Sequence, residues 1–364
     1  MDSQTIRNTL DTDSFTLKTP DGQEQWLTIR TGGDGALFKG LRREINHLEG
    51  QVIAQFVMAG NAHFEKGFDD LQPVSWPVTW IQGDACQHGV IYSSQIAVIT
   101  GPELTPVRLG DQLLGYAYET ENARFCRLAG VRPDDVSASR QQQTRSVFEQ
   151  MEAALEQCGM QFKDTVRTWL YLDRLLDWYE EFNQVRSRFF EEQGVFDRIV
   201  PASTGIGASN PYGAALVADA LAVVPKNDAC RIAAVPSPLQ CPAINYKSAF
   251  SRAIELSFPS YRQLLVSGTA SIAPDGTSAY LDDPVAQIDL TMRVVEAILH
   301  ARDMDWSDLS RGIAYFKDSK DVALWDDWCL RHPEVPLFPL GISHADVCRD
   351  DLLFEIELDA VKVG

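Results

Sequence analysis

The chain has 364 residues, which is room for two ordinary domains or a fused pair of smaller ones. With 45% hydrophobic and 23% charged residues the composition is globular, and it excludes a disordered or collagen-like chain. The 32 basic and 51 acidic side chains give a formal net charge of −19, so nucleic acid and anionic membranes are poor partners. An anionic substrate would need a local cluster of arginines acting against this field.

Targeting and metal-binding signals are missing from the sequence. No stretch reaches the roughly 18 apolar residues of a transmembrane helix, and residues 1–15 lack the basic start and apolar centre of a secretory signal. The seven cysteines and six histidines are scattered, without a CxxC pair or an HExxH motif. We therefore expect a cytoplasmic protein without a metal site or a disulfide framework.

Residues 1–90 form the first predicted region. They contain two strand-like runs, QWLTIRT (25–31) and QVIAQFVMAG (51–60), followed by the Pro/Trp-rich stretch PVSWPVTW (73–80). The region matches nothing later in the chain, so two interpretations stay open: an N-terminal extension of the next sheet, or a degenerate third unit.

Residues 91–226 are predicted to form a first α+β module. Val147, Met151 and Leu155 recur at helical spacing, and the runs around this helix are short and apolar, as in strands. The predicted order is strand, long helix, strand, second helix and closing strand, at 124–131, about 143–157, 165–172, 175–190 and 214–225.

A second module is predicted at residues 240–364, after a proline-containing linker at 226–243. It repeats the order of elements of the first module, with strands at 263–272, 309–316 and 351–361 and a second helix at 321–332. Each module is then a sheet backed on one face by two helices, and the uncovered sheet face needs a partner, which we expect to be the sister module.

An internal repeat connects the two modules. At an offset of 144 residues, 143–171 aligns without a gap over 287–315, with eight identities in 29 positions. The pairs Asp164/Asp308, Arg167/Arg311 and Tyr171/Tyr315 follow the long helix, so helical periodicity does not explain them. The sequence therefore predicts a duplicated module.

The motifs of the second module resemble those of the YjgF/RidA fold, which is chorismate-mutase-like. The resemblance rests on AFSRAI (249–254), LLVSGTASI (264–272), LSRGIAYF (309–316) and LLFEIELDAVKV (352–363). RidA-like modules trimerise with ligand sites between neighbours, so tandem modules imply a pseudo-oligomer. Two such modules, with VPASTGIGASNPYG (200–213) closing the first, resemble the chorismatases, which remove the enolpyruvyl group of chorismate as pyruvate without a cofactor.

Glu355 is the predicted catalytic acid. Strand alternation places Glu355 and Glu357 on the face opposite Phe354, Ile356 and Leu358, where the modules are expected to meet. A carboxyl partly buried there would have a raised pKa and could donate a proton. The RidA-like terminal-strand glutamate corresponds to Glu355 here and to Val217 in the first module, which implies one active site per chain. The alternative is a solvated strand carboxylate.

Two further residues carry the resemblance to one chorismatase branch. A cysteine at the spacing of Cys348, together with Ala270, implies the 3-hydroxybenzoate-forming type, in which a ring oxygen displaces pyruvate, and it makes Cys348 a second candidate catalytic residue beside Glu355. Gly268 and Thr269, directly before Ala270, are then candidate substrate contacts. The alternative for Cys348 is a small buried hydrophobic side chain.

A dicarboxylate substrate needs cations or converging N–H donors. Guanidinium groups bind carboxylates bidentately, so Arg167 and Arg311 are candidates, and which of them faces the ligand stays open. Backbone N–H groups of a glycine-containing loop can also bind an anion, although the same segment could be a simple turn. The candidates in and after this loop are Ser203, Thr204, Gly205, Gly207, Asn210 and Tyr212.

The leading hypothesis is a chorismatase that forms 3-hydroxybenzoate, with 4-hydroxybenzoate as a plausible second product. The alternatives are a chorismate hydrolase giving a dihydroxycyclohexadiene carboxylate, a RidA-type enamine/imine deaminase, and a non-catalytic binding module for a small acid. The deaminase is disfavoured because Ser203 and, by alignment, Pro339 stand where those enzymes carry an arginine. The expected partner is a small dicarboxylate rather than nucleic acid or membrane, and assembly into a homo-oligomer stays open.

Overall fold

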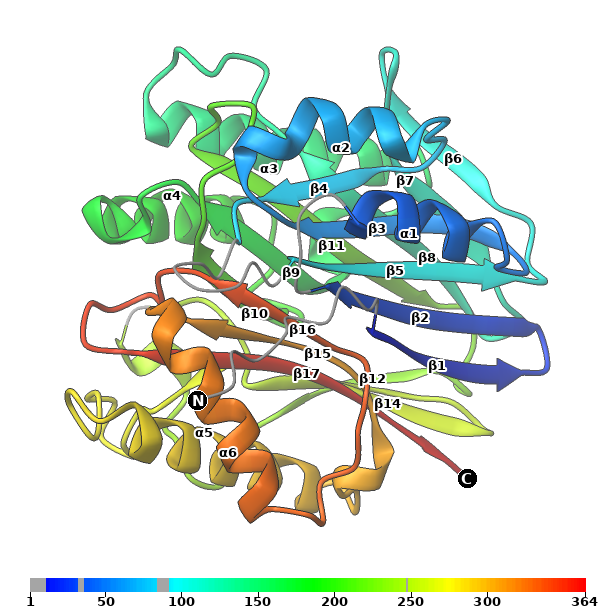
Figure 1. The fold of residues 1–364 in the computed structure, drawn as a ribbon. Helices are drawn as coiled ribbons and strands as arrows, with labels where there is room; N and C mark the ends of the chain where they lie inside the picture. Colours follow the sequence, from blue (N-terminus) through cyan, green and yellow to red (C-terminus); the bar gives the residue numbers. More distant parts are fainter. Residues whose placement is uncertain (1–10, 32–35, 84–91, 247) are drawn as a thin grey trace.

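The computed structural model describes residues 11–31, 36–83, 92–246 and 248–364. These residues form three mixed sheets, each covered on its outer side by two helices, so the predicted α+β architecture is confirmed (Figure 1). Within the described residues, no helix is both long and apolar enough to cross a membrane.

The first unit is an independent sheet. Its elements are β1 (Asp11–Thr19), β2 (Gly22–Thr31), α1 (Ala36–Ile45), β3 (Gln51–Met58), α2 (Phe64–Leu71), β4 (Val78–Ile81) and β5 (Tyr92–Thr100). The strand order is β1-β2-β5-β3-β4, with β3 and β4 parallel. Because β5 lies in the middle of this sheet, the unit extends past residue 90, where the sequence placed its end.

The second unit uses the same topology with one more strand. Its elements are β6 (Thr105–Leu109), β7 (Gln112–Glu119), β8 (Ala123–Val131), α3 (Arg140–Glu156), β9 (Thr165–Leu172), α4 (Tyr179–Glu192), β10 (Ala202–Gly207) and β11 (Leu216–Pro225). The order is β10-β9-β11-β8-β7-β6, and β10 pairs parallel with β9. Ser203–Gly207 therefore lies in a strand, rather than in the loop that its glycines suggested.

The third unit repeats this arrangement. Its elements are β12 (Arg231–Val235), β13 (Ala253–Ser257), β14 (Tyr261–Ala270), α5 (Pro284–His300), β15 (Leu309–Phe316), α6 (Ala323–Arg331), β16 (Leu340–His344) and β17 (Phe354–Val363), in the order β12-β13-β14-β17-β15-β16. The predicted linker thus contains β12. Ser203 pairs with Thr168 and Leu340 with Gly312, so Leu340, rather than Pro339, occupies the position equivalent to Ser203.

The internal repeat is visible in the element bounds. Adding 144 to the bounds of α3 and β9 gives 284–300 and 309–316, which are the bounds of α5 and β15. Both long helices begin at a capping side chain: Ser139 accepts from the Gln142 N–H and Asp283 from the Ala286 N–H. Their apolar stripes pack on the sheets, for example through Met151 and Met292.

The three units close into a ring. The last parallel strand of each unit lies against the next unit: β4 against β8 and β11, β10 against β14, and β16 against β5 and β2. Equivalent hydrogen bonds recur at two junctions, from the Gly130 N–H to Thr79 Oγ1 (2.8 Å) and from the Gly268 N–H to Thr204 Oγ1 (3.1 Å). The N-terminal unit therefore supplies the third member of a pseudo-threefold arrangement, with the helices outside and the sheets facing inward (Figure 1).

Candidate active site

A narrow cavity lies where the second and third units meet. Its volume is about 30 Å³, and it adjoins a groove of about 600 Å³ that shares Tyr179, Ser248 and Cys348 with it. The cavity is lined by Tyr179, Arg186, Ser203, Gly205, Ser248, Phe250, Arg252, Gly268, Ala270, Ile272, Cys348 and Glu355. Both units contribute to it, through α4 and β10 on one side and β14 and β17 on the other.

Glu355 is the acid of this cavity. Along β17, Ile356 and Leu358 pack on the helices of the third unit, so alternation turns Glu355 toward the second unit. Its side chain is buried, and burial, together with the negative charge of Glu357, raises its pKa to about 8. At neutral pH the carboxyl group is therefore mainly protonated and able to donate a proton.

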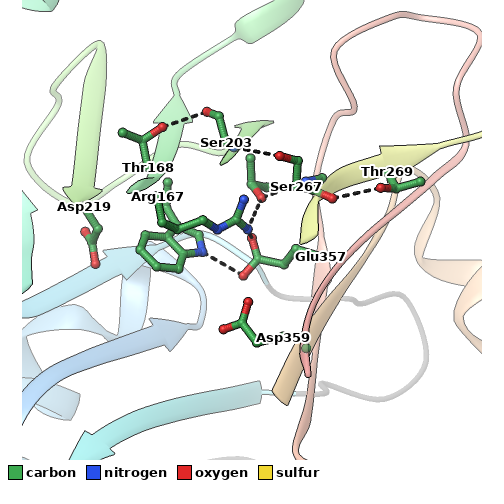
Figure 2. A network of polar contacts seen from close by, with 12 residues as sticks. Arg167, Thr168, Ser203, Asp219, Ser267, Thr269, Glu357 and Asp359 are labelled. Atoms are coloured by element: carbon green, nitrogen blue, oxygen red, sulfur yellow. Dashed lines mark hydrogen bonds and ion pairs between the residues drawn. The ribbon is translucent and has the colours of Figure 1, made fainter. Parts of the chain in front are cut away.

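Glu357 has the opposite electrostatic environment. It forms an ion pair with Arg311. Figure 2 shows its ion pair with Arg167 at 3.0 Å and the hydrogen bond at 2.8 Å that it accepts from Trp169 Nε1. Burial alone would raise its pKa, but the two guanidinium groups hold that pKa below its usual value. Arg311 also pairs with Asp359 at 2.8 Å. Glu357 is not a solvated strand carboxylate, because its side chain is fully buried in this network.

Because Gly268 has no side chain, the Glu355 carboxyl group can lie directly beside it. A Cβ built on Gly268 would be 2.0 Å from Glu355 Oε1, so a larger residue would displace the acid. The Gly268 N–H donates to Thr204 Oγ1, which also accepts from Arg167 Nη2 at 2.7 Å. The glycine is therefore fixed by the same network that keeps Glu357 ionised.

Two arginines supply positive charge to the cavity. Arg186 comes from α4, is buried, and donates from Nη2 to Asn183 Oδ1 at 2.5 Å. Arg252 precedes β13, is also buried, and donates to the Cys241 carbonyl at 2.8 and 3.1 Å. One guanidinium from each unit lines the cavity, which suits a ligand with two carboxylates.

The edge of β10 offers neutral donors. The Ser203 N–H donates to Ser267 Oγ (2.9 Å) and the Gly207 N–H to the Asp346 carbonyl (2.8 Å), so both point away from β9. Gly205 lies between them at the two-residue period of a strand, so its N–H has the same direction, toward the cavity that Gly205 lines. The Ser203 hydroxyl accepts from Thr168 Oγ1 (2.8 Å), which leaves its own hydrogen for another acceptor.

The wall beside Glu355 is apolar. Ala270 and Ile272 pack with Val347, Leu352 and Cys348 into a small hydrophobic cluster. Burial, followed by the proximity of Glu355, raises the pKa of the Cys348 thiol to about 12. Cys348 is therefore a neutral thiol that shapes this wall, rather than a thiolate nucleophile.

The structure brings six of the predicted residues together around the cavity: Glu355, Cys348, Ala270, Gly268, Ser203 and Gly205. Arg167 and Arg311 do not line it, because both are fully buried in the ion pairs with Glu357 and Asp359. Thr204 lies in the same network. Four others have structural contacts: the Thr269 hydroxyl bonds the Ser267 carbonyl, Gly207 pairs with Asp346, Asn210 closes its own loop, and Tyr212 packs under Arg132.

The prediction missed six lining residues: Tyr179, Arg186, Ser248, Phe250, Arg252 and Ile272. A signal for Arg186 was present, since it falls on the apolar stripe of its helix, four residues after Phe182 and three before Phe189. An arginine on such a stripe requires a buried acceptor or a ligand. Across the described residues, the side chains of His, Cys, Asp and Glu form no group that could hold a metal ion.

The sequence is similar to those of known chorismatases. The family model "Chorismatase FkbO/Hyg5-like, N-terminal" matches residues 108–222. A 3-hydroxybenzoate synthase from Streptomyces hygroscopicus is 27% identical over 245 residues, 59% of this chain and 68% of that protein. A chorismatase from Streptomyces rapamycinicus is 25% identical over 221 residues, 54% of this chain and 64% of that protein.

The fold extends the similarity to the whole chain. A chorismatase crystal structure superimposes with a TM-score of 0.63 and 16% identity, covering 97% of this chain and 98% of that one. The predicted resemblance to the chorismatases is therefore confirmed, and residues 108–222 match the model of the FkbO/Hyg5-like chorismatase N-terminal family.

Proposed function

We propose that this protein is a chorismatase that converts chorismate to 3-hydroxybenzoate and pyruvate, with 4-hydroxybenzoate as a second product. The observation that carries the proposal is the buried carboxyl group of Glu355, whose pKa is raised to about 8, in a cavity lined by Arg186 and Arg252. This combination suits a dicarboxylate whose reaction begins with proton donation. The similarity to a 3-hydroxybenzoate synthase and a chorismatase supports the same assignment.

Glu355 supplies the proton in this mechanism. It protonates the methylene carbon of the enolpyruvyl group, and the bond between the ring carbon and the ether oxygen breaks, with its electron pair leaving on pyruvate. The oxygen of the neighbouring ring hydroxyl bonds to that ring carbon to give an arene oxide, and the hydroxyl proton passes to the Glu355 carboxylate. The bond from this oxygen to its original ring carbon then breaks, and the hydrogen on the newly bonded carbon leaves as a proton while the oxygen gains one, which gives the phenol of 3-hydroxybenzoate. Chorismate is C10H10O6, the sum of hydroxybenzoic and pyruvic acids, so the step consumes no water, oxidant or cofactor.

The apolar wall favours displacement of pyruvate by the ring hydroxyl oxygen over hydrolysis by water. Ala270, Ile272 and Cys348 present few groups that could hold a nucleophilic water beside the ring. The ring's own hydroxyl oxygen is then the available nucleophile. Arg186, Arg252, Ser203 and the Gly205 N–H would hold the two carboxylates. The unpaired thiols among the described residues suit a cytoplasmic enzyme.

Chromatography of purified protein incubated with chorismate tests the proposal. Pyruvate is expected in an amount equal to that of 3-hydroxybenzoate and 4-hydroxybenzoate together. A dihydroxycyclohexadiene carboxylate with pyruvate would show the hydrolase reaction instead, and absence of pyruvate would overturn the chorismatase assignment. Ammonia release from 2-iminobutyrate would point to a deaminase, and thermal stabilisation by chorismate without turnover would point to a binding module.

A further inference from the structure

A second cavity adjoins the active site. It has a volume of about 340 Å³ and an apolar lining, in which Val200, Val235, Pro242 and Ile244 take part. Phe250 and Arg252 line both this cavity and the active site. The two cavities are therefore neighbours that share those two side chains.

Gln240 is a buried polar side chain in the lining of the second cavity. Its side chain is buried and lines the cavity, and its Nε2 donates to the Ala270 and Ile272 carbonyls at 2.9 and 3.0 Å. Within the described residues, Gln240 Oε1 is buried without a hydrogen-bond partner. Buried polar atoms are nearly always satisfied, so this oxygen calls for a donor from outside the protein.

We propose that this cavity is a second binding site for a small aromatic hydroxy acid. The apolar walls suit a planar ring, Gln240 Oε1 accepts from a phenolic hydroxyl, and Arg252 attracts a single carboxylate. Chorismate fits less well, because its second carboxylate would lie against apolar side chains. The ligand class is that of the product of the proposed reaction, so the choice of ligand depends on the proposed function.

Occupation of this site should affect turnover. Arg252 faces both cavities, and the Gln240 amide holds the carbonyl of Ala270, which lines the active site. A ligand that hydrogen-bonds to Gln240 and pairs with Arg252 therefore changes the affinity of the active site for chorismate. The expected result is mixed inhibition by the aromatic product, acting through a site that the substrate does not occupy.

Binding of 3-hydroxybenzoate to the purified protein, followed by calorimetry, tests the proposal. Ala234 lines the second cavity from β12 and is exposed, so Ala234→Trp fills the cavity without disturbing the core. Ala233→Trp is the matched control: Ala233 is also exposed, points to the opposite face of β12 and is not part of the lining. We expect Ala234→Trp to weaken binding at this site at least 10-fold and to relieve the mixed inhibition, while Ala233→Trp behaves as wild type.

Benzoate tests the role of Gln240. Because it lacks the phenolic hydroxyl, it should bind the site sensitive to Ala234→Trp at least 5-fold more weakly than 3-hydroxybenzoate does. Binding and inhibition unchanged in Ala234→Trp would overturn the proposal, whether or not chorismate is turned over. Conversely, binding of 3-hydroxybenzoate that Ala234→Trp abolishes, in a protein without chorismate turnover, would support the site and overturn the proposed function.

Discussion

Glu355 and Glu357 lie two residues apart on one face of β17, and their environments drive their pKa values in opposite directions. Arg311 and Arg167 keep Glu357 ionised, and the resulting negative charge adds to burial in keeping Glu355 protonated. One strand thus carries an anion that supports a neighbouring acid. The two repeated arginines act on the site through Glu357, rather than by touching the ligand.

Replacing the acid should remove most of the activity. Glu355→Gln keeps the shape of the side chain but has no proton of suitable acidity, so kcat should fall by about 10²- to 10⁴-fold with the fold intact. In the wild type, kcat should decline as pH rises through about 8, where Glu355 loses its proton. Steady-state kinetics between pH 5 and 9.5 measure both effects, and an unchanged kcat in Glu355→Gln would remove Glu355 from the mechanism.

The same substitution should stabilise the protein at neutral pH. The pKa of Glu355 rises from 4.5 in the unfolded chain to about 8 in the fold, so stability falls as pH increases between those values. Glutamine does not titrate, so its stability does not fall with pH in this way. The linkage therefore predicts that Glu355→Gln is more stable than wild type by about 3 kcal/mol at pH 7. Urea unfolding at pH 7 and pH 4 checks this, since the difference should vanish at pH 4.

Neutralising Glu357 should shift the pH dependence of catalysis. Glu357→Gln removes the negative charge that raises the pKa of Glu355, so the decline of kcat should move about one pH unit or more to lower pH. The variant also leaves Arg167 and Arg311 without their shared partner, which should cost about 3–5 kcal/mol of stability. Kinetics at a temperature where circular dichroism shows folded protein separate the two effects, and an unshifted profile would contradict the coupling.

The space beside the acid should not tolerate a methyl group. Gly268→Ala places a Cβ 2.0 Å from Glu355 Oε1, so the carboxyl must move, and a displacement of this size costs about 10²-fold in kcat. Gly205→Ala is the comparison, because a Cβ there meets nothing within 4 Å. It should change KM for chorismate more than kcat. Equal kcat values for the two variants would argue against a requirement for space at Gly268.

Charge at residue 186 should matter for substrate binding. Arg186→Gln removes a buried guanidinium that lines the cavity, and loss of a charge-assisted contact should raise KM about 10- to 100-fold. Arg188→Gln, on the same helix but exposed, removes the same charge outside the cavity. Its KM should change less than about 2-fold at 0.15 M salt, because the exposed charge is screened. Similar KM values for both variants would indicate a general electrostatic effect.

Much of this architecture could be predicted because it follows from the sequence repeat and from the periodicity of apolar residues. The 144-residue repeat located the long helices and their following strands, and the alternation along β17 predicted which way Glu355 points. The third unit was only one of two interpretations of residues 1–90, because its sequence has diverged while its sheet order has not. Glu355 pairs with Tyr315, and the equivalent pairs in the other units are Val217 with Tyr171 and Ser93 with Met58.

The roles of the arginines could not be assigned from spacing alone. Arg167 and Arg311 have the chemistry of carboxylate ligands, but the carboxylates that they bind, Glu357 and Asp359, belong to the same chain. Whether an arginine meets a protein acid or a substrate depends on contacts between segments up to 190 residues apart, as in the Arg167–Glu357 pair. Arg252 was passed over for the same reason, since only the packing of the two units brings it to the cavity.

The closed ring of three units has an evolutionary consequence. In a ring of identical subunits, any substitution appears at all three junctions, so a buried acid placed at one is imposed on the others. Here each junction is encoded by its own stretch of chain and can change separately. Glutamate could therefore be kept at position 355, while valine at 217 and serine at 93 spare the other two junctions the destabilisation that a buried carboxyl group brings.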